Sequence, residues 1–172
     1  MTISNNGRRR GGRGGFTLAE AIMATVVVGI AAAGVLLPFG SGAAVRAEGM
    51  RRTLAAKLAG ELMEEIVAKP FHDPGGSSYY YNLGPDSGET SVTYFDNVDD
   101  YHGYTEAQGQ IKDVGKNLIA DWKYGKFSRD VTCAYVYVPQ ESGVENARFI
   151  RVTVQVYYGG NQVTSITRLI GK

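Results

Sequence analysis

The hydrophobic pattern of the chain begins with an apolar run over residues 16–45, in which Glu20 is the only charged side chain. As a helix rising about 1.5 Å per residue, residues 16–39 alone would span roughly 36 Å, more than the roughly 30 Å of a hydrocarbon core. The run therefore predicts a membrane-spanning helix. Four arginines lie just before it, and acids outnumber bases in the residues after it, so the positive-inside rule predicts a cytoplasmic N-terminus and an extracytoplasmic head.

The pattern changes to that of an amphipathic helix over residues 46–69. Large apolar side chains recur every four residues and most charged side chains lie off this stripe. The stripe consists of Met50, Leu54, Leu58, Leu62 and Ile66, widened by Ala47, Ala55, Ala59 and Met63. We expect this helix to continue the membrane helix and to stop at Pro70, because proline disfavours helix at the residue before it. Pro38 and the glycines around it predict a kink or a locally unwound stretch in between.

The rest of the chain carries the pattern of an antiparallel sheet. Residues 70–90 are rich in glycine and proline and predict irregular loop, and residues 91–125 mix short β-prone pieces such as 91–95 with polar turns. Apolar and polar positions then alternate over residues 127–138 and 150–157, which is typical of strands. Residues 159–161, Gly-Gly-Asn, suit a tight hairpin. We therefore predict an α+β fold in which three to five strands pack against the stripe of the amphipathic helix.

The composition and charge of the chain agree with this fold and exclude some classes of protein. An apolar fraction of 44% with 20% charged residues is inconsistent with a wholly disordered chain. The formal charge of +1 divides unevenly: four arginines and no acids lie in residues 1–15, which leaves fourteen bases and seventeen acids, or −3, for the remainder. Cys133 is the only cysteine, so the chain contains neither an intramolecular disulfide nor a cysteine-based zinc cluster.

The basic leader ends in glycines immediately before the apolar run. A secretory signal places its cleavage site after an apolar core of about 7–15 residues, whereas the natural break here lies before the core. The segment GGFTLAEAIMATVVVGI, residues 14–30, has glycine, then phenylalanine, then glutamate at the fifth position. It resembles the N-terminus of type IV prepilins and of the pseudopilins of type II secretion.

This resemblance implies how the N-terminus is processed and how the subunit assembles. A membrane prepilin peptidase would cut between Gly15 and Phe16 and methylate the new amine of Phe16, and Glu20 would be the acid retained for assembly. The segments would then be a prepilin leader (1–15), a transmembrane and filament-core helix (16–45), its amphipathic continuation (46–69) and an extracytoplasmic head (70–172). The whole would have the type IV pilin-like fold.

The resemblance also implies a structural function. The chain would be a minor pilin or pseudopilin of a type IV pilus or a type II secretion pseudopilus, serving adhesion, motility, DNA uptake or protein secretion. Its partners would be other pilin subunits, the prepilin peptidase and an inner-membrane assembly platform. We expect it first in the inner membrane and then in a periplasmic or extracellular filament. The missing cysteine pair departs from many type IV pilins, whose C-terminal loop is closed by a disulfide.

Glu20 has a physical reason to find a partner that does not depend on the family. A carboxylate at the centre of a membrane helix is disfavoured by about 2.5–3.5 kcal/mol, and somewhat less near a helix end. The amine of a mature Phe16 would offer a cationic partner, within one helix or between helices staggered by one subunit. The competing interpretation is an acid tolerated near the membrane interface.

Two other classes of protein remain open. One is a single-pass anchored protein whose head binds a surface ligand without polymerising. The other is a secreted protein cut near residues 42–44, where small residues occur. Although RRRGGRGG resembles RNA-binding tails, its place directly before a membrane segment favours a topogenic role, so no nucleic acid is expected as a partner.

The head offers few candidates for chemistry. Asp96, Asp99 and Asp100 could supply oxygen ligands to calcium, although their spacing is not that of an EF-hand and such clusters are usually solvated. His72 and His102 are the only histidines and fit no triad, so we predict no catalytic site, no enzyme activity and no cofactor other than this calcium candidate. The tyrosines and Trp122 all lie in the head, where they could form a recognition surface for adhesion, although packing is their more usual role. Cys133 is expected to be a small buried side chain.

Overall fold

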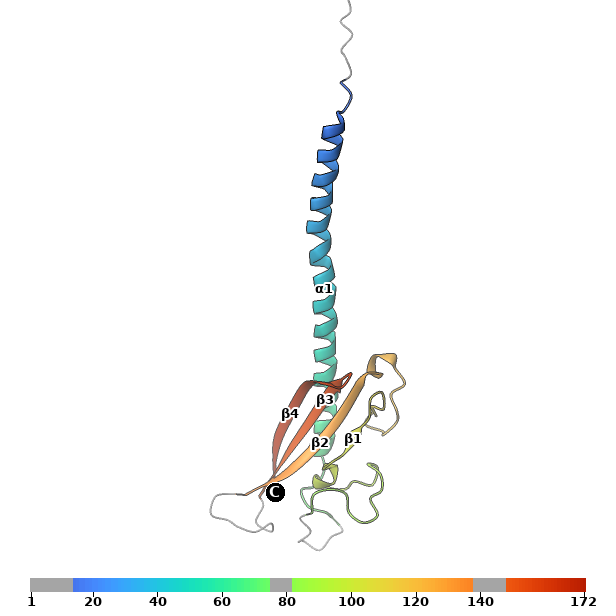
Figure 1. The fold of residues 1–172 in the computed structure, drawn as a ribbon. Helices are drawn as coiled ribbons and strands as arrows, with labels where there is room; N and C mark the ends of the chain where they lie inside the picture. Colours follow the sequence, from blue (N-terminus) through green and yellow to red (C-terminus); the bar gives the residue numbers. More distant parts are fainter. Residues whose placement is uncertain (1–13, 75–81, 138–147) are drawn as a thin grey trace, which may run out of the picture. The chain divides into compact units, whose positions relative to one another are not determined.

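The computed structural model describes residues 14–74, 82–137 and 148–172, so most of the predicted leader lies outside the described residues. The chain divides into two compact units, Met1–Arg46 and Ala47–Lys172. One helix, α1 (Leu18–Val67), contributes residues to both (Figure 1). The backbone is helical through Pro38, so the predicted alternative of a locally unwound stretch is wrong, and the alternative of a kink stays a prediction. A proline within a helix removes only the hydrogen bond of its own missing N–H group, so the helix can continue past it.

The second unit contains a four-stranded antiparallel sheet, which confirms the α+β class. Its strands are β1 (Thr105–Glu106), β2 (Phe127–Val136), β3 (Phe149–Tyr158) and β4 (Asn161–Gly171), paired in sequence order. Two short 3-10 helices, η1 (Asp99–Tyr101) and η2 (Trp122–Tyr124), lie in the connections. The long strands occupy the two segments in which the sequence alternates, together with the segment after the hairpin.

The turn between β3 and β4 is the tight glycine hairpin that the sequence predicts. Tyr158 pairs with Asn161, which leaves Gly159 and Gly160 as the two central residues of the turn. Their φ angles are 59° and 83°, a conformation that residues with a Cβ rarely adopt. A two-residue turn of this kind matches the right-handed twist of the flanking strands and so sets their register.

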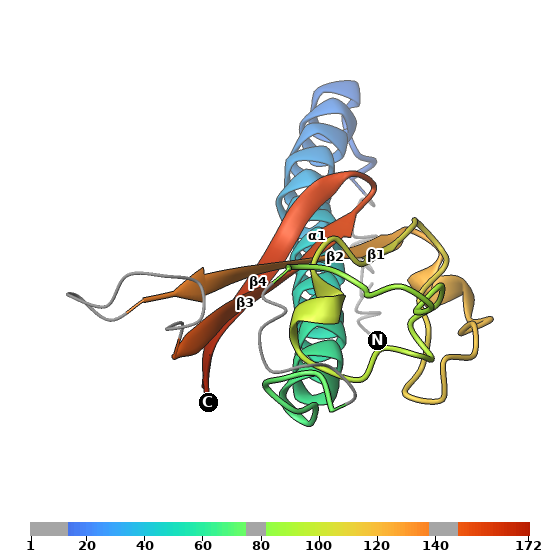
Figure 2. The ribbon, with the colours of Figure 1, turned by 90° about the horizontal axis from the view of Figure 1, so that it is seen from below.

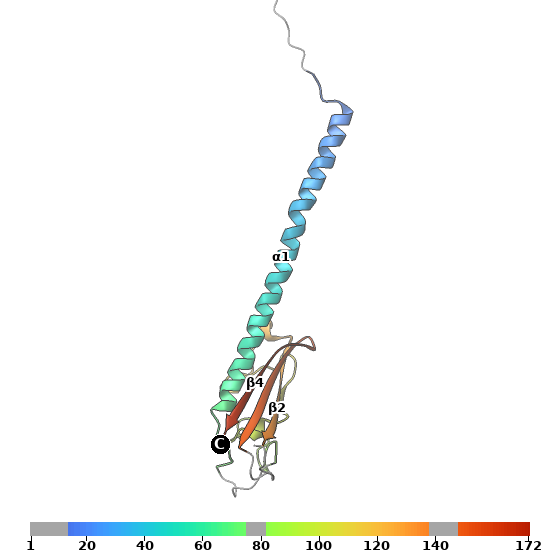
Figure 3. The same ribbon diagram turned by 90° about the vertical axis from the view of Figure 1, so that its left-hand side faces the viewer.

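The core of the second unit lies between α1 and one face of the sheet (Figure 3). The buried helix residues follow the predicted stripe from its second turn onward: Ala55, Leu58, Ala59, Leu62, Met63 and Ile66. They meet the inward side chains of β2 and β3, namely Phe127, Val131, Cys133, Ile150, Val152, Val154 and Val156. Burial of a large aliphatic side chain contributes about 1.5–3 kcal/mol, so this face holds the helix to the sheet. Met50, at the start of the stripe, is exposed, because the core begins only at Leu54.

The connection before the sheet closes the far end of the core. Residues 91–95 form turns and not a strand, so their β-prone composition is misleading. Val92 and Phe95 are nevertheless buried, and the apolar character of the segment serves packing without strand pairing. In Figure 2, η1 and its neighbouring loop lie beside the last turns of α1. The amide of Val98 donates to the carbonyl of Pro70 at 3.0 Å and fixes this loop to the end of the helix.

Candidate functional site

The predicted cleavage site lies at a well-defined change in backbone structure. Gly14, Gly15, Phe16 and Thr17 are exposed and non-helical, and α1 begins at Leu18. The amide and the hydroxyl of Thr17 both donate to Oε2 of Glu20, at 2.9 and 3.0 Å. The amide of Glu20 donates in return to the Thr17 hydroxyl at 3.3 Å. Thr17 and Glu20 therefore form a capping box that satisfies amide groups left without partners at the start of a helix.

The capping box is a local role for Glu20 that was not predicted from the sequence. Its signature, Thr-x-x-Glu directly before an apolar run, is present in residues 17–20. Both hydrogen bonds from Thr17 go to Oε2, and a carboxylate has a second oxygen with which to meet a cation. Capping and pairing with a neighbouring amine are therefore compatible.

The first half of α1 is apolar and exposed around its circumference. Residues Leu18–Leu36 have a mean hydropathy of 2.1 and no buried part, and they form a helix long and apolar enough to cross a membrane. At about 1.5 Å per residue they extend roughly 28 Å, close to the thickness of a hydrocarbon core. Large side chains along this segment, such as Leu18, Met23 and Ile30, are 69–80% exposed. An exposed apolar surface of this extent is typical of a segment that contacts lipid or other apolar surfaces.

The acidic loop, residues 89–100, groups its carboxylates differently from the predicted calcium candidate. Ligand atoms of Glu89, Asp96 and Asp100 lie within 4.8 Å of one another, whereas Asp99 is not part of this group. Oδ2 of Asp99 accepts from the Tyr135 hydroxyl at 2.5 Å, and its Oδ1 is buried without a hydrogen-bond partner. In the structure Glu89 therefore takes the place of Asp99 among the clustered carboxylates, and binding of calcium stays a prediction.

The carboxylate of Asp100 mainly holds the backbone of its own loop in place. Its Oδ2 accepts from the amides of Asp96 and Asn97 at 2.8 and 2.9 Å, and the residue is 1% exposed. Burial, opposed by these amides, raises the pKa of Asp100 to about 7, with the neighbouring Glu89 adding to the shift.

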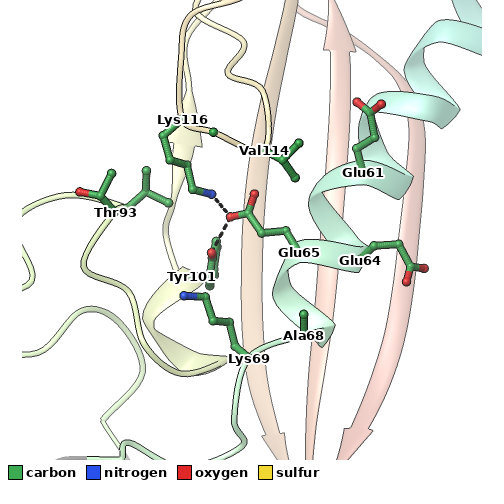
Figure 4. A pocket seen from close by; sticks show the side chains of 11 residues that line it. Glu61, Glu64, Glu65, Ala68, Lys69, Thr93, Tyr101, Val114 and Lys116 are labelled. Atoms are coloured by element: carbon green, nitrogen blue, oxygen red, sulfur yellow. Dashed lines mark hydrogen bonds and ion pairs between the residues drawn. The ribbon is translucent and has the colours of Figure 1, made fainter.

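A groove of about 870 Å³ lies between the last turns of α1 and the loops at residues 92–93 and 114–116. Figure 4 shows Lys116 and Tyr101 directed at the same carboxylate, that of Glu65. The Tyr101 hydroxyl donates to Glu65 at 2.5 Å, and Lys116 forms an ion pair with it. Burial is the first cause of the strongly raised pKa of Tyr101, followed by this carboxylate.

The other charged groups along the groove also have partners within the described chain. Glu61 pairs with Lys57, Glu64 pairs with Arg168, and Lys69 donates to the carbonyl of Phe95. A ligand would have to displace these contacts to be held by charge. The groove is therefore better described as a polar junction between helix and loops than as a binding site.

Arg129 of β2 and Glu106 of β1 form a buried ion pair within the sheet. Their side chains are 4% and 2% exposed, with 2.6 Å between nitrogen and oxygen. Arg129 also donates to the carbonyls of Leu58 in α1 and Lys112 in the loop, both at 3.0 Å. The alternation of the strand puts Arg129 on its inward face, but no spacing rule points to Glu106 as its partner.

The cysteine is buried, and one of the two histidines forms a hydrogen bond with its backbone amide. Nδ1 of His102 accepts the amide of Cys133 at 3.1 Å, so the ring proton lies on Nε2. Burial lowers the pKa of His72. Cys133 is buried as expected, and burial raises the pKa of its thiol to about 12.

The aromatic side chains are divided between packing and exposure. Phe95, Tyr101 and Tyr104 form an edge-to-face cluster with ring centroids 5.1–6.0 Å apart. Tyr94 and Trp122 are 63% and 87% exposed. The tyrosines at residues 79–81 lie outside the described residues.

Comparison of the chain with models of protein families, with curated proteins and with solved structures found no match.

Proposed function

We propose that the chain is a structural subunit, a minor pilin or pseudopilin, of a type IV pilus or a type II secretion pseudopilus. The observation that supports this most is the junction at the start of α1. The bond between Gly15 and Phe16 lies in exposed, non-helical backbone, directly before a helix whose apolar surface is exposed. A peptidase needs such accessible backbone, and cleavage there would leave the whole apolar helix on the mature protein.

In this proposal the same apolar surface serves twice, first in the membrane and then in the filament. Surface that faces lipid before assembly faces neighbouring copies afterwards. Small residues permit close approach of helix backbones, which is how helices associate in lipid. The first half of α1 carries several of them: Ala21, Ala24, Gly29, Ala31, Ala32, Ala33 and Gly34.

Glu20 would set the position of each subunit along the filament. The amine released at Phe16 by cleavage keeps its positive charge after methylation. In surroundings of low dielectric constant, its attraction to a carboxylate is stronger than in water. The second carboxylate oxygen of Glu20 is the group that would meet this amine on a neighbouring chain, while Oε2 keeps its bonds to Thr17.

Two matched variants separate the capping role of Glu20 from its role in assembly. Glu20→Gln keeps an oxygen that can accept from the Thr17 amide but has no charge. Thr17→Val keeps the charge of Glu20 and weakens the cap, at a cost of about 1 kcal/mol. We expect both variants in the membrane fraction, with only Thr17→Val recovered in sheared filaments. Incorporation of Glu20→Gln at the wild-type level would contradict a charge-based register.

A further inference from the structure

Trp122 and a group of cations gather at one end of the second unit. Trp122 is the only tryptophan of the chain and is 87% exposed, although tryptophan is highly buried on average. It begins η2, and its carbonyl accepts the amide of Gly125 at 3.1 Å, so the turn that carries it is closed by a hydrogen bond. Lys123 and Lys126 are exposed on the same turn.

Arg51 and Arg52 of α1 lie beside this turn. The guanidinium of Arg51 stands 5.1 Å from the ring centre of Tyr158, and the amine of Lys126 lies 6.0 Å from the same ring. Both arginines line a groove of about 400 Å³ together with Lys126 and the β3–β4 turn. These contacts place Arg51, Arg52 and Lys126 together at the end of the unit where its first residue, Ala47, lies. Trp122 and Lys123 belong to the turn that directly precedes Lys126 in the chain.

Positive and negative charges are unevenly distributed over the second unit. Residues 47–172 carry thirteen bases and sixteen acids, a net charge of −3. Glu48 forms ion pairs with both Arg51 and Arg52, and Asp121 forms one with Lys123. The four cations exceed these two acids by +2, which leaves −5 elsewhere in the unit. Residues 70–111 contain seven acids and no lysine or arginine. An anionic surface would therefore attract the Trp122 end and repel the acidic loop.

The chain itself keeps a membrane surface close to this end. Ten residues, 37–46, separate the end of the membrane-length segment at Leu36 from Ala47. Even a fully extended connection of this length reaches at most roughly 40 Å. Such a short tether gives the head a high effective concentration at the bilayer surface.

We propose that the turn of Trp122, together with Arg51, Arg52, Lys123 and Lys126, is a docking surface for anionic lipid headgroups of the membrane that holds the apolar helix. Indole rings are enriched at the membrane interface because they combine an apolar body with a polar N–H group. Lysines and arginines near an anionic surface are attracted to it within a Debye length. The proposal rests on the membrane-spanning helix and not on assembly into a filament. Docking would hold the head against the bilayer until a competing partner displaces it.

The sole tryptophan provides the readout. Full-length protein is reconstituted into vesicles of phosphatidylcholine, or of phosphatidylcholine mixed with phosphatidylglycerol, and Trp122 emission is recorded with and without lipids brominated on their acyl chains. We expect a blue shift and bromolipid quenching in the anionic vesicles, both reversed by salt. Lys123→Gln with Lys126→Gln should lower the ratio of docked to free heads by roughly 25-fold, at about 5-fold per cation.

The matched control removes two exposed cations from the opposite end of the sheet, Arg151→Gln with Lys172→Gln. This variant should behave as the wild type. Equal emission in the two kinds of vesicle, or equal losses in the two double variants, would overturn the proposal. A blue shift that varies with the ratio of protein to lipid and is not quenched by bromolipid would assign the surface to a second copy of the chain and would also overturn it.

Discussion

Substituting Arg129 by leucine is expected to destabilise the head by about 3–5 kcal/mol, because it leaves the Glu106 carboxylate buried without its cation. The guanidinium also donates to the carbonyls of Leu58 and Lys112. These acceptors would lose their partners in a site that water does not reach. Within the described part of the chain, the Glu106 carboxylate would keep the hydrogen bond that the Tyr104 hydroxyl donates to it at 2.9 Å.

Urea unfolding of the full-length protein in detergent micelles measures this loss. The near-ultraviolet circular dichroism of the packed tyrosines reports the tertiary structure of the head. With a slope of about 2 kcal/mol per molar urea, the midpoint should fall by roughly 2 M. The double variant Arg129→Leu with Glu106→Leu should recover part of the loss, since it leaves no charge unpaired in the core.

The matched control is the exposed ion pair between Lys57 and Glu61 on α1. Its atoms are 3.6 Å apart and its side chains are 60% and 49% exposed. Lys57→Leu should change the stability by less than about 0.5 kcal/mol. If Arg129→Leu costs no more than Lys57→Leu, the buried contacts of Arg129 do not stabilise the head and the reasoning is refuted.

Three further outcomes are expected of the head. Gly160→Ala should destabilise it by about 1 kcal/mol because the φ of this residue is 83°. Gly60→Ala, in a helix with open space at the new Cβ, should stabilise it by about 0.5–1 kcal/mol, and in urea titrations a stabilising Gly160→Ala or a destabilising Gly60→Ala would contradict the respective assignment. The pKa of Asp100 is raised from 3.8 to about 7, so between pH 3.8 and about 7 the folded state holds a proton that the unfolded chain has released, and the stability of the head should fall as the pH rises. Asp100→Asn should flatten the dependence of the urea midpoint on pH in this window, and an unchanged slope would contradict the shift. Burial raises the pKa of Cys133 to about 12, so a thiol reagent should label the native protein far more slowly than the urea-unfolded protein, and equal rates would show that the strand is open.

The parts of the fold that the sequence predicts are those with a regular period. The stripe from Leu54 to Ile66, the alternation in β2 and β3, and the glycine turn all follow from local rules, and each is found in the structure. Residues 91–95 have a β-prone composition without forming a strand, because aromatic and β-branched residues also fill the core from turns. Met50 fits the periodic stripe but lies before the sheet begins to cover the helix.

The polar contacts of the site are only partly predictable. The capping box of Thr17 and Glu20 has a local signature that can be read from the sequence. The ion pair of Glu65 with Lys116 joins residues 51 positions apart, and that of Arg129 with Glu106 spans 23. No periodicity encodes such distances. Asp99 is close to Asp96 and Asp100 in sequence, whereas η1 directs its carboxylate to Tyr135.

The most direct test of the proposed function is the N-terminus of the mature protein. Intact-mass and terminal-peptide mass spectrometry of the membrane-extracted chain should show an N-terminus at Phe16 bearing a methylated amine, as expected for a pilin-like subunit. A chain that still begins at Met1 would indicate an anchored protein, a start near Ala44 would indicate a secreted one, and either result would contradict the account.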